Sequence, residues 1–288
     1  MSRQRDRPPG NLQGLERWIT ESANAGETTP GRLRKRVGLI ALAAMIEAFN
    51  EDEPSFVFKG GAAFELRFGT RARSTSDVDA VFRGNLEDSV AFLEQALRSG
   101  WSGFTGTLVD KGTFYVPGVR ISPRRSIAKL SYRGRPFLSL PIEVAAPEGE
   151  SLLRIDQVEV APLAELGLGG PGVVPLLGVP YQVAQKLHAC TAPDSPDYTN
   201  DRAHDLADLL LLDELGTIDP SETKEACLVV FEHRQMHPWP PAIQVRPHWP
   251  GLWRFIVEDD GFPIADINDA AERVRQLLAR IDDADTAG

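Results

Sequence analysis

Two aspartates, Asp77 and Asp79, stand one residue apart in the apolar run SDVDAVF at residues 76–82. If this run is a strand, both carboxylates lie on one face, with Cα atoms about 6.6 Å apart at about 3.3 Å per residue. Carboxylates at that spacing can hold the paired divalent ions of phosphoryl and nucleotidyl transfer. Mg²⁺ commonly takes one or two carboxylates, with phosphates and waters as its other ligands. The alternative is a solvated polar face, although two like charges on one face repel each other.

A lysine and two glycines, Lys59, Gly60 and Gly61, end a short hydrophobic run that predicts a strand, and a helical pattern starts at the glycines. The unpaired N–H groups and the dipole of a helix N-terminus favour a phosphate, and the lysine adds a positive charge at the same corner. The spacing is not that of a P-loop, because no G-K-S/T triplet follows. The pattern therefore indicates either a triphosphate-binding corner or an ordinary strand-to-helix turn.

A single glutamate, Glu143, is the only charged residue in FLSLPIEVAA at residues 137–146. We expect a strand here, and Pro141 indicates an edge or irregular strand. On such a strand Glu143 could act as a third metal ligand, or as a base, beside the aspartate pair. A solvated glutamate is the alternative.

The chain is acidic as a whole, with a formal net charge of −10, yet no acidic residue lies between Lys111 and Ile142. That stretch carries seven basic residues: Lys111, Arg120, Arg124, Arg125, Lys129, Arg133 and Arg135. A basic face of this kind could bind a polyanion despite the acidic body. It could equally protect a strand edge from aggregation, and both interpretations stay open.

The elements that must position these residues belong to an α+β pattern in the first part of the chain. We expect residues 1–12 to be disordered and two helices to lie within residues 13–50. Thr29 is the expected N-cap of the second helix, with Pro30 in its first turn. Beyond the aspartate pair and one further helix, strands joined by turns are expected.

The second part of the chain is predicted to be helical. Helices are expected at residues 180–192, 201–215, 220–235 and 265–282, with a proline- and tryptophan-rich loop between the last two. The Gly-, Pro- and Leu-rich stretch at 146–180 predicts the crossover between two lobes. We therefore place a first lobe at 1–160 and a helical lobe at 161–288, and expect a ligand site in a cleft between them.

Composition limits the class of protein further. The two cysteines, Cys190 and Cys227, have no metal-ligand spacing, so a disulfide-stapled or zinc-ribbon fold is not expected. The N-terminus has no apolar signal-peptide segment. The longest helix-like apolar run, residues 37–46, is much shorter than the roughly 20 residues that span a bilayer. We expect a cytoplasmic protein with no membrane partner.

The helical lobe offers its own candidates. Lys186 lies on the polar side of a predicted helix, where it could neutralise a triphosphate or could simply be an exposed lysine. Asp205 and Asp208 are three residues apart on the next helix. Asp208 is the better candidate for a general base or for orienting Lys186, whereas Asp205 would have a structural role near the helix N-terminus.

Aromatic and basic residues are interleaved near the end of the chain. The mixture comprises Trp239, Trp249, Trp253, Arg234, Arg246 and His237. It could stack unpaired bases, or the tryptophans could fix a loop against the helices, and we favour the second interpretation.

A strand–Gly-Gly–helix unit, a D-x-D pair and an acid on a later strand together resemble a nucleotidyltransferase of the DNA polymerase β type. The chain further resembles the AbiEii/AbiGii-type nucleotidyltransferase toxins in four blocks, KGGAAFELRFG, RSTSDVDAVF, AQKLHACTA and NDRAHDLADLLLL. Within that family it is similar to the mycobacterial MenT toxins in AKLSYRGRPF, PIEVA and HPWPP. The blocks occur in the expected order between about residues 30 and 280.

The resemblance implies a polymerase-β-type nucleotidyltransferase lobe with a mixed sheet, followed by an α-helical lobe. It implies a toxin of a toxin–antitoxin system that uses Mg²⁺ or Mn²⁺ and transfers nucleoside monophosphates from NTP to the 3′ CCA end of tRNA. That modification would block aminoacylation and translation. The implied partners are tRNA, NTP and a cognate antitoxin, which in some relatives is kinase-like.

The resemblance also assigns roles to residues. It implies that Asp77 and Asp79 bind metal and are catalytic, and that Lys59, Gly60 and Gly61 bind the nucleotide. It places Lys186 and Asp208 among the residues needed for activity and Arg234 in the same cleft, and Thr75 matches a regulatory phosphorylation site. Relatives often carry lysine where this chain has Ser76, so the preferred nucleotide does not follow from the resemblance.

Two other functions remain compatible with the sequence. One is nucleotidylation of a protein or small-molecule hydroxyl. The other is non-catalytic binding of a nucleotide or RNA, in which the protein acts by occupancy.

Overall fold

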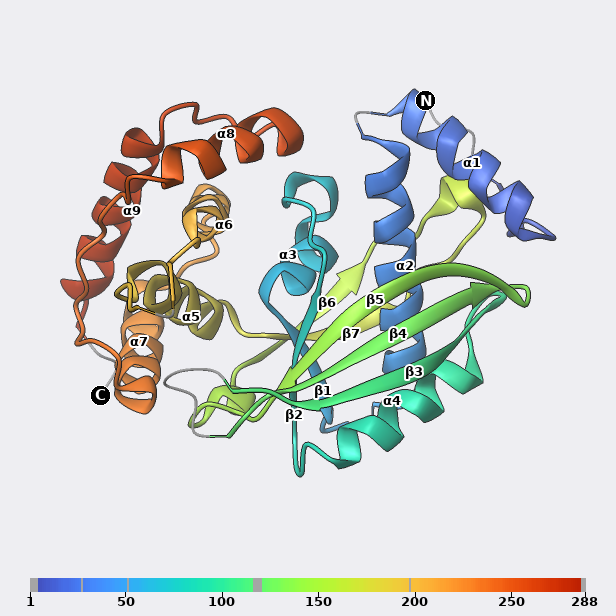
Figure 1. Cartoon of the computed structure of the whole chain (residues 1–288), viewed down its shortest axis with the longest axis horizontal. Coiled ribbons are helices and arrows are strands. Elements are labelled where there is room, and N and C mark those ends of the chain that lie inside the picture. The colour runs from blue at the N-terminus through green and yellow to red at the C-terminus, as the bar shows by residue number, and fades with distance from the viewer. Residues whose placement is uncertain (1–4, 27, 51, 116–120, 197, 286–288) are drawn as a thin grey trace. The chain divides into compact units, whose positions relative to one another are not determined.

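The computed structural model of the chain describes residues 5–26, 28–50, 52–115, 121–196 and 198–285 (Figure 1). These residues form two compact units. The first comprises the described residues of 1–116, 121–147 and 155–176, and the second contains residues 148–154 and the described residues of 177–288. The first unit thus extends beyond the expected lobe boundary at residue 160.

A mixed seven-stranded sheet organises the first unit, in the order β3-β4-β5-β2-β1-β7-β6. The strands are β1 (Phe56–Lys59), β2 (Val78–Phe82), β3 (Phe104–Thr113), β4 (Arg124–Tyr132), β5 (Arg135–Ala145), β6 (Ile155–Val160) and β7 (Gly172–Leu177). β2 runs parallel to β5 and β1 parallel to β7, whereas the β1–β2, β3–β4 and β4–β5 pairs are antiparallel. The expected α+β class with a mixed sheet is therefore confirmed.

Four helices belong to the same unit: α1 (Leu12–Ala25), α2 (Pro30–Glu47), α3 (Gly60–Phe68) and α4 (Asp88–Ser99). As expected, the Thr29 hydroxyl caps α2 by accepting the Arg32 N–H at 3.2 Å, and Pro30 occupies the first turn. α2 and α4 pack against β3–β5 (Figure 1). Alternate residues of β4 are buried from Ser126 to Tyr132, so Arg125 and Lys129 lie on the opposite, open face.

The N-terminal segment differs from the expected disorder over its described part, residues 5–11. Pro9 is buried, and its carbonyl accepts a hydrogen bond from the Tyr132 hydroxyl. The Arg5 N–H donates to the Ala164 carbonyl at 3.0 Å, and the Arg5 guanidinium lies 3.8 Å from the centre of the Trp18 ring. Residues 1–4 lie outside the described residues.

The structure differs from the sequence-based expectation at two places in the sheet. The stretch at 146–180, expected to be a crossover, contributes β6 and β7 to the sheet, because their buried residues, such as Val174 and Leu176, complete its core. Pro141 lies in an interior strand, so the edge position is wrong, whereas the alternative of an irregular strand agrees with the register shift in the β4–β5 pairing. Pairing of β5 with β2 starts only at Ile142, so Pro141 precedes the paired segment on that side and its missing N–H is tolerated there.

Five helices form the second unit: α5 (Val179–Thr191), α6 (Ala203–Glu214), α7 (Pro220–Arg234), α8 (Trp249–Asp260) and α9 (Ile267–Asp282). α5 packs against α6 and α7, and α9 contacts α6, α7 and α8. α8 was missed because its prolines and tryptophans were taken for a loop. Trp249, Trp253 and Ile256 are buried with helical spacing, and Pro250 lies in the first turn, where it breaks no helix hydrogen bond.

Among the described residues, no helix combines the length and the apolar composition that crossing a membrane requires.

Candidate active site

The corner between β1 and α3 carries the predicted phosphate-binding residues. β1 ends at Lys59, and α3 begins at Gly60, whose φ of 57° lies in the left-handed region that favours glycine. Lys59 is paired with Asp79 across the antiparallel β1–β2 ladder. A Cβ atom at Gly60 would overlap the Asp79 carboxylate. Glycine is therefore needed at this position both for the backbone conformation and for the close approach of Asp79.

The second glycine makes room for the loop that leads to Asp77. A Cβ atom at Gly61 would lie 2.6 Å from Thr75 Oγ1. The Thr75 hydroxyl donates to the Asp77 carbonyl at 3.1 Å, and the Thr75 N–H donates to Glu65 Oε2 at 3.4 Å. Glu65 is buried in α3; burial raises its pKa, while the Thr75 N–H and Arg36 act in the opposite direction. Gly61, Glu65 and Thr75 thus place the loop before Asp77 on α3.

The two aspartates differ in how their backbone is held. Asp79 is the second residue of β2, whereas Asp77 lies on the bend directly before it. Because the strand starts at Val78, later than expected, strand alternation fixes the face of Asp79 but not that of Asp77. Both side chains are half-buried.

Glu143 lies beside Asp79, as the sequence suggested, because the two residues are register partners on the parallel strands β2 and β5. The next strand places Arg125 opposite Glu143. Arg125 donates to Glu143 Oε1 through Nε, at 2.9 Å, and through Nη2. Lys59, Asp79, Glu143 and Arg125 therefore form one row across four neighbouring strands, with charges plus, minus, minus and plus.

The carboxylates determine which metal site fits. Within the described part of the chain, no group of three or more His, Cys, Asp or Glu side chains is arranged to hold a metal ion. A set of two carboxylates remains, and such hard oxygen ligands suit Mg²⁺ or Mn²⁺ when substrate phosphates and waters supply the rest. The Asp79 carboxylate occupies the space left by the missing Cβ of Gly60, and the oxygen ligands that Asp79 and Asp77 offer are of the type that such a site uses.

In the second unit, Lys186 is not the exposed lysine of the ordinary alternative. It is 6% exposed, and its Nζ lies 2.9 Å from Asp205 Oδ1 and 2.5 Å from Asp208 Oδ2. Asp205 and Asp208 are themselves 3% and 1% exposed. Burial alone would raise the pKa of Asp205, but the charge of Lys186, with His204 and Arg202, outweighs it and holds that pKa below its usual value.

Arg234 is joined to a residue that sequence reasoning missed. Its Nε and Nη2 donate to Glu148 Oε1 and Oε2 at 2.8 and 3.2 Å, and Gln185 Nε2 donates to Oε2 at 2.9 Å. Arg234 Nη1 lies 3.3 Å from His188 Nδ1. No local signal marks Glu148, because its partner is far away in the sequence. Burial, followed by the charge of Arg234 and by His237, lowers the pKa of His188 to about 3.

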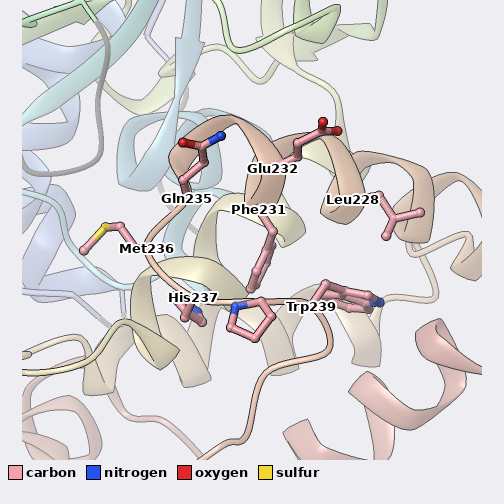
Figure 2. A pocket seen from close by; sticks show the side chains of 8 residues that line it. Leu228, Phe231, Glu232, Gln235, Met236, His237 and Trp239 are labelled. Atoms are coloured by element: carbon pink, nitrogen blue, oxygen red, sulfur yellow. The ribbon is translucent and has the colours of Figure 1, made fainter.

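A pocket of about 690 Å³ opens beside the C-terminal end of α7 (Figure 2). Phe231, His237 and Trp239 line it with edge-on ring contacts. Trp249 and Trp253 are buried in the core of the second unit, which agrees with a structural role, but they belong to helix α8 and not to the expected loop.

Some residues of the basic stretch at 111–135 form ion pairs, and others are exposed. Arg124 binds Asp110, and Arg125 binds Glu143. Lys111, Lys129, Arg133 and Arg135 are exposed, and Arg120 lies outside the described residues.

The chain is similar to known nucleotidyltransferase proteins in sequence and in fold. A family model described as nucleotidyl transferase AbiEii toxin, type IV TA system, matches residues 41–280. Among solved structures, MenT4, a nucleotidyltransferase toxin from Mycobacterium tuberculosis H37Rv, matches with a TM-score of 0.59 and 17% identity, over 94% of this chain and 90% of that chain. An antigenic nucleotidyltransferase-like protein from Paracoccidioides brasiliensis matches with a TM-score of 0.37 and 15% identity, over 78% and 90%. No curated protein sequence matches the chain. The likeness to MenT4 confirms the expected nucleotidyltransferase fold.

Proposed function

The chain belongs to the AbiEii family of nucleotidyltransferase toxins of type IV toxin–antitoxin systems, and on that premise we propose that it transfers nucleoside monophosphates from NTP to the 3′ CCA end of tRNA in a Mg²⁺- or Mn²⁺-dependent reaction. The modified tRNA could not be aminoacylated, and translation would stop. The observation that carries the proposal is the glycine corner, where Gly60 admits the Asp79 carboxylate directly beside a helix N-terminus.

In the proposed reaction, the acceptor 3′-hydroxyl attacks the α-phosphorus of the NTP. A phosphodiester bond forms, the bond to the β-phosphate breaks, pyrophosphate leaves and the hydroxyl proton passes to water. The divalent ion supplies charge stabilisation at the phosphoryl oxygens when it is bound. Asp77 and Asp79 would hold it, with Glu143 beside them on β5.

The chain's other groups would bind the triphosphate. The first N–H groups of α3, at Gly60 and Gly61, have no partner within the helix and lie at its positive end, and Lys59 adds a full charge. From the second unit we assign Lys186, Asp208 and Arg234 to the reaction. Asp205 and Asp208 both accept hydrogen bonds from the buried Lys186 ammonium, so we give Lys186 and Asp208 a joint positioning role and not a direct contact with the triphosphate.

The exposed lysines and arginines of residues 111–135 support a polyanionic acceptor. RNA binding should therefore weaken steeply with salt.

The test is incubation of the protein with each labelled NTP and total tRNA, followed by sequencing of the 3′ ends. We expect label on tRNA 3′ ends with the wild-type protein and none with Asp77→Asn or Asp79→Asn at unchanged thermal stability. Label on protein or on a small molecule would replace the tRNA assignment by another acceptor. Toxicity retained without labelling by either aspartate variant would indicate action by occupancy.

Regulation by a cognate antitoxin, kinase-like or otherwise, is part of the proposal. The Thr75 hydroxyl lies between Gly61 and the Asp77 carbonyl, where a phosphate would add about −1.5 to −2 charge next to carboxylates that must recruit a cation and a triphosphate. We expect phosphorylation of Thr75 to inactivate the enzyme.

Intact mass and peptide mapping after co-expression with the antitoxin would test this regulation. A toxin that is inhibited but unmodified would show that the antitoxin acts by binding or repression.

A further inference from the structure

The row of charges on the sheet extends past the carboxylates to Arg125. Laterally paired residues lie on the same face, so Arg125 on β4 shares one face of the sheet with Glu143 and Asp79. Neighbouring strands are about 4.8 Å apart, which places Arg125 about 10 Å from Asp79 along the row. Lys129 follows on the same face of β4, four residues away. A substrate bound at Asp79 could therefore extend towards Arg125.

The Arg125 guanidinium is held on two sides. Its Nε and Nη2 donate to a single oxygen, Glu143 Oε1, and its central carbon lies 4.3 Å from the centre of the Phe114 ring. No described residue bonds Nη1, and the side chain is 48% exposed. A carboxylate and an aromatic face thus orient the planar group, while about half of the side chain remains exposed.

This arrangement suits the binding of an anion. Arginine recognises phosphate through its fixed set of N–H donors, and a guanidinium that is already oriented loses less entropy on binding. An exposed ion pair contributes only about 0–1 kcal/mol to stability, so this pair adds little to the stability of the fold.

Resting on the proposed function, we propose that Arg125 binds a phosphate group of the substrate and that Glu143 is the positioning residue that holds it. The phosphate belongs either to the NTP or to the RNA backbone. Glu143 then acts through Arg125, and not as the third metal ligand that the sequence suggested. The double donation to Glu143 Oε1 and the lack of a three-carboxylate group among the described residues both favour this role.

The test compares Arg125→Gln, Glu143→Gln and the double variant in the full-length protein. It measures Mn²⁺ affinity in the presence of a non-hydrolysable NTP analogue, KM for NTP, and the dissociation constant of tRNA against salt concentration. For Arg125→Gln we expect about 10- to 100-fold weaker binding of one substrate, the loss typical of a charge-assisted hydrogen bond. If the phosphate belongs to RNA, the slope of log binding constant against log salt concentration should also fall in magnitude by about 1. If the phosphate belongs to NTP, KM for NTP should rise instead.

Glu143→Gln should weaken the binding of the same substrate by a smaller factor and leave the affinity for Mn²⁺ unchanged. In the double variant it should cause no loss of affinity beyond that of Arg125→Gln. Arg125→Lys should restore part of the affinity, because it keeps the charge but not the planar donors. The matched control is Arg98→Gln, which removes another carboxylate-paired arginine of the same unit and should change nothing.

Three results would overturn the inference. Unchanged substrate binding in Arg125→Gln would show that Arg125 does not bind a substrate phosphate. Weaker Mn²⁺ binding in Glu143→Gln would show that Glu143 is a metal ligand. If the losses of substrate affinity add up in the double variant, Arg125 and Glu143 act independently of each other. A failure of the proposed function itself would give a different result from these three. In that case Asp79→Asn would bind Mn²⁺ as tightly as the wild type does.

Discussion

Gly60 satisfies two requirements at one residue. Its φ of 57° favours glycine, and the absence of a Cβ atom lets the Asp79 carboxylate approach the first turn of α3. A carboxylate at a helix N-terminus is stabilised there, yet it also occupies the place to which a cation and a triphosphate must come. The residue therefore couples the backbone of the phosphate corner to the position of a metal ligand.

The substitution Gly60→Ala should disturb both properties. A non-glycine residue in the left-handed region costs about 1–3 kcal/mol of folding free energy. The added methyl must also push the Asp79 carboxylate aside, and displacement of a reacting group by about 1 Å can cost about 100-fold in rate. We expect a modest fall in melting temperature and a loss of at least that size in kcat, measured by thermal unfolding and by labelled-nucleotide transfer.

The control for Gly60→Ala is Gly216→Ala. Gly216 has a similar φ of 63°, and no described atom lies within 4 Å of the position that its Cβ would take. This variant should show the backbone penalty with wild-type activity. Equal activity in the two variants would mean that the place of the Asp79 carboxylate beside Gly60 does not matter for the reaction.

At the scale of elements, the pairing of β4 with β5 shows what the sequence could and could not predict. Strands joined by a turn were expected here, and the turn falls at Arg133 and Gly134. Counting back from that turn would pair Arg125 with Ile142, a core residue. A register shift between Leu130 and Ser131 moves Arg125 opposite Glu143 instead. A shift of one residue changes the partner and the face, and no local pattern marked it.

The glycine corner was predictable because its signal is local. Strand, glycines and helix follow one another in the chain, and the side-chain types match the chemistry. Lys186 was harder. Its position on the polar side of α5 suggested exposure, but α5 packs against both α6 and α7, and the lysine is enclosed between Asp205 and Asp208. Burial of this kind depends on tertiary neighbours, which periodicity within one helix does not contain.

At the scale of the whole molecule, buried ionisable groups make stability depend on pH. His188 is 2% exposed, and its Nδ1 accepts from Arg234 Nη1 at 3.3 Å, so in the neutral ring the proton is on Nε2. Burial and the charge of Arg234 lower the pKa of His188 to about 3. In the unfolded chain the pKa of a histidine is about 6.5. Between these two values the unfolded state binds a proton that the folded state does not bind.

Stability must therefore fall as the pH falls from about 6.5 towards 3, because the unfolded state binds more protons over that range. The expected loss of unfolding free energy from His188 alone is about 2 kcal/mol between pH 7 and pH 5, at about 1.36 kcal/mol per pKa unit.

The variant His188→Asn keeps an acceptor for Arg234 but cannot titrate. Urea unfolding followed by tryptophan fluorescence at several pH values should show a flatter profile for His188→Asn. The comparison variant is His233→Asn, which removes a partly exposed histidine from α7 and leaves His188 in place. Parallel profiles for wild type and His188→Asn would mean that His188 is protonated in the folded protein, and the Arg234–His188 contact would then have to open in acid.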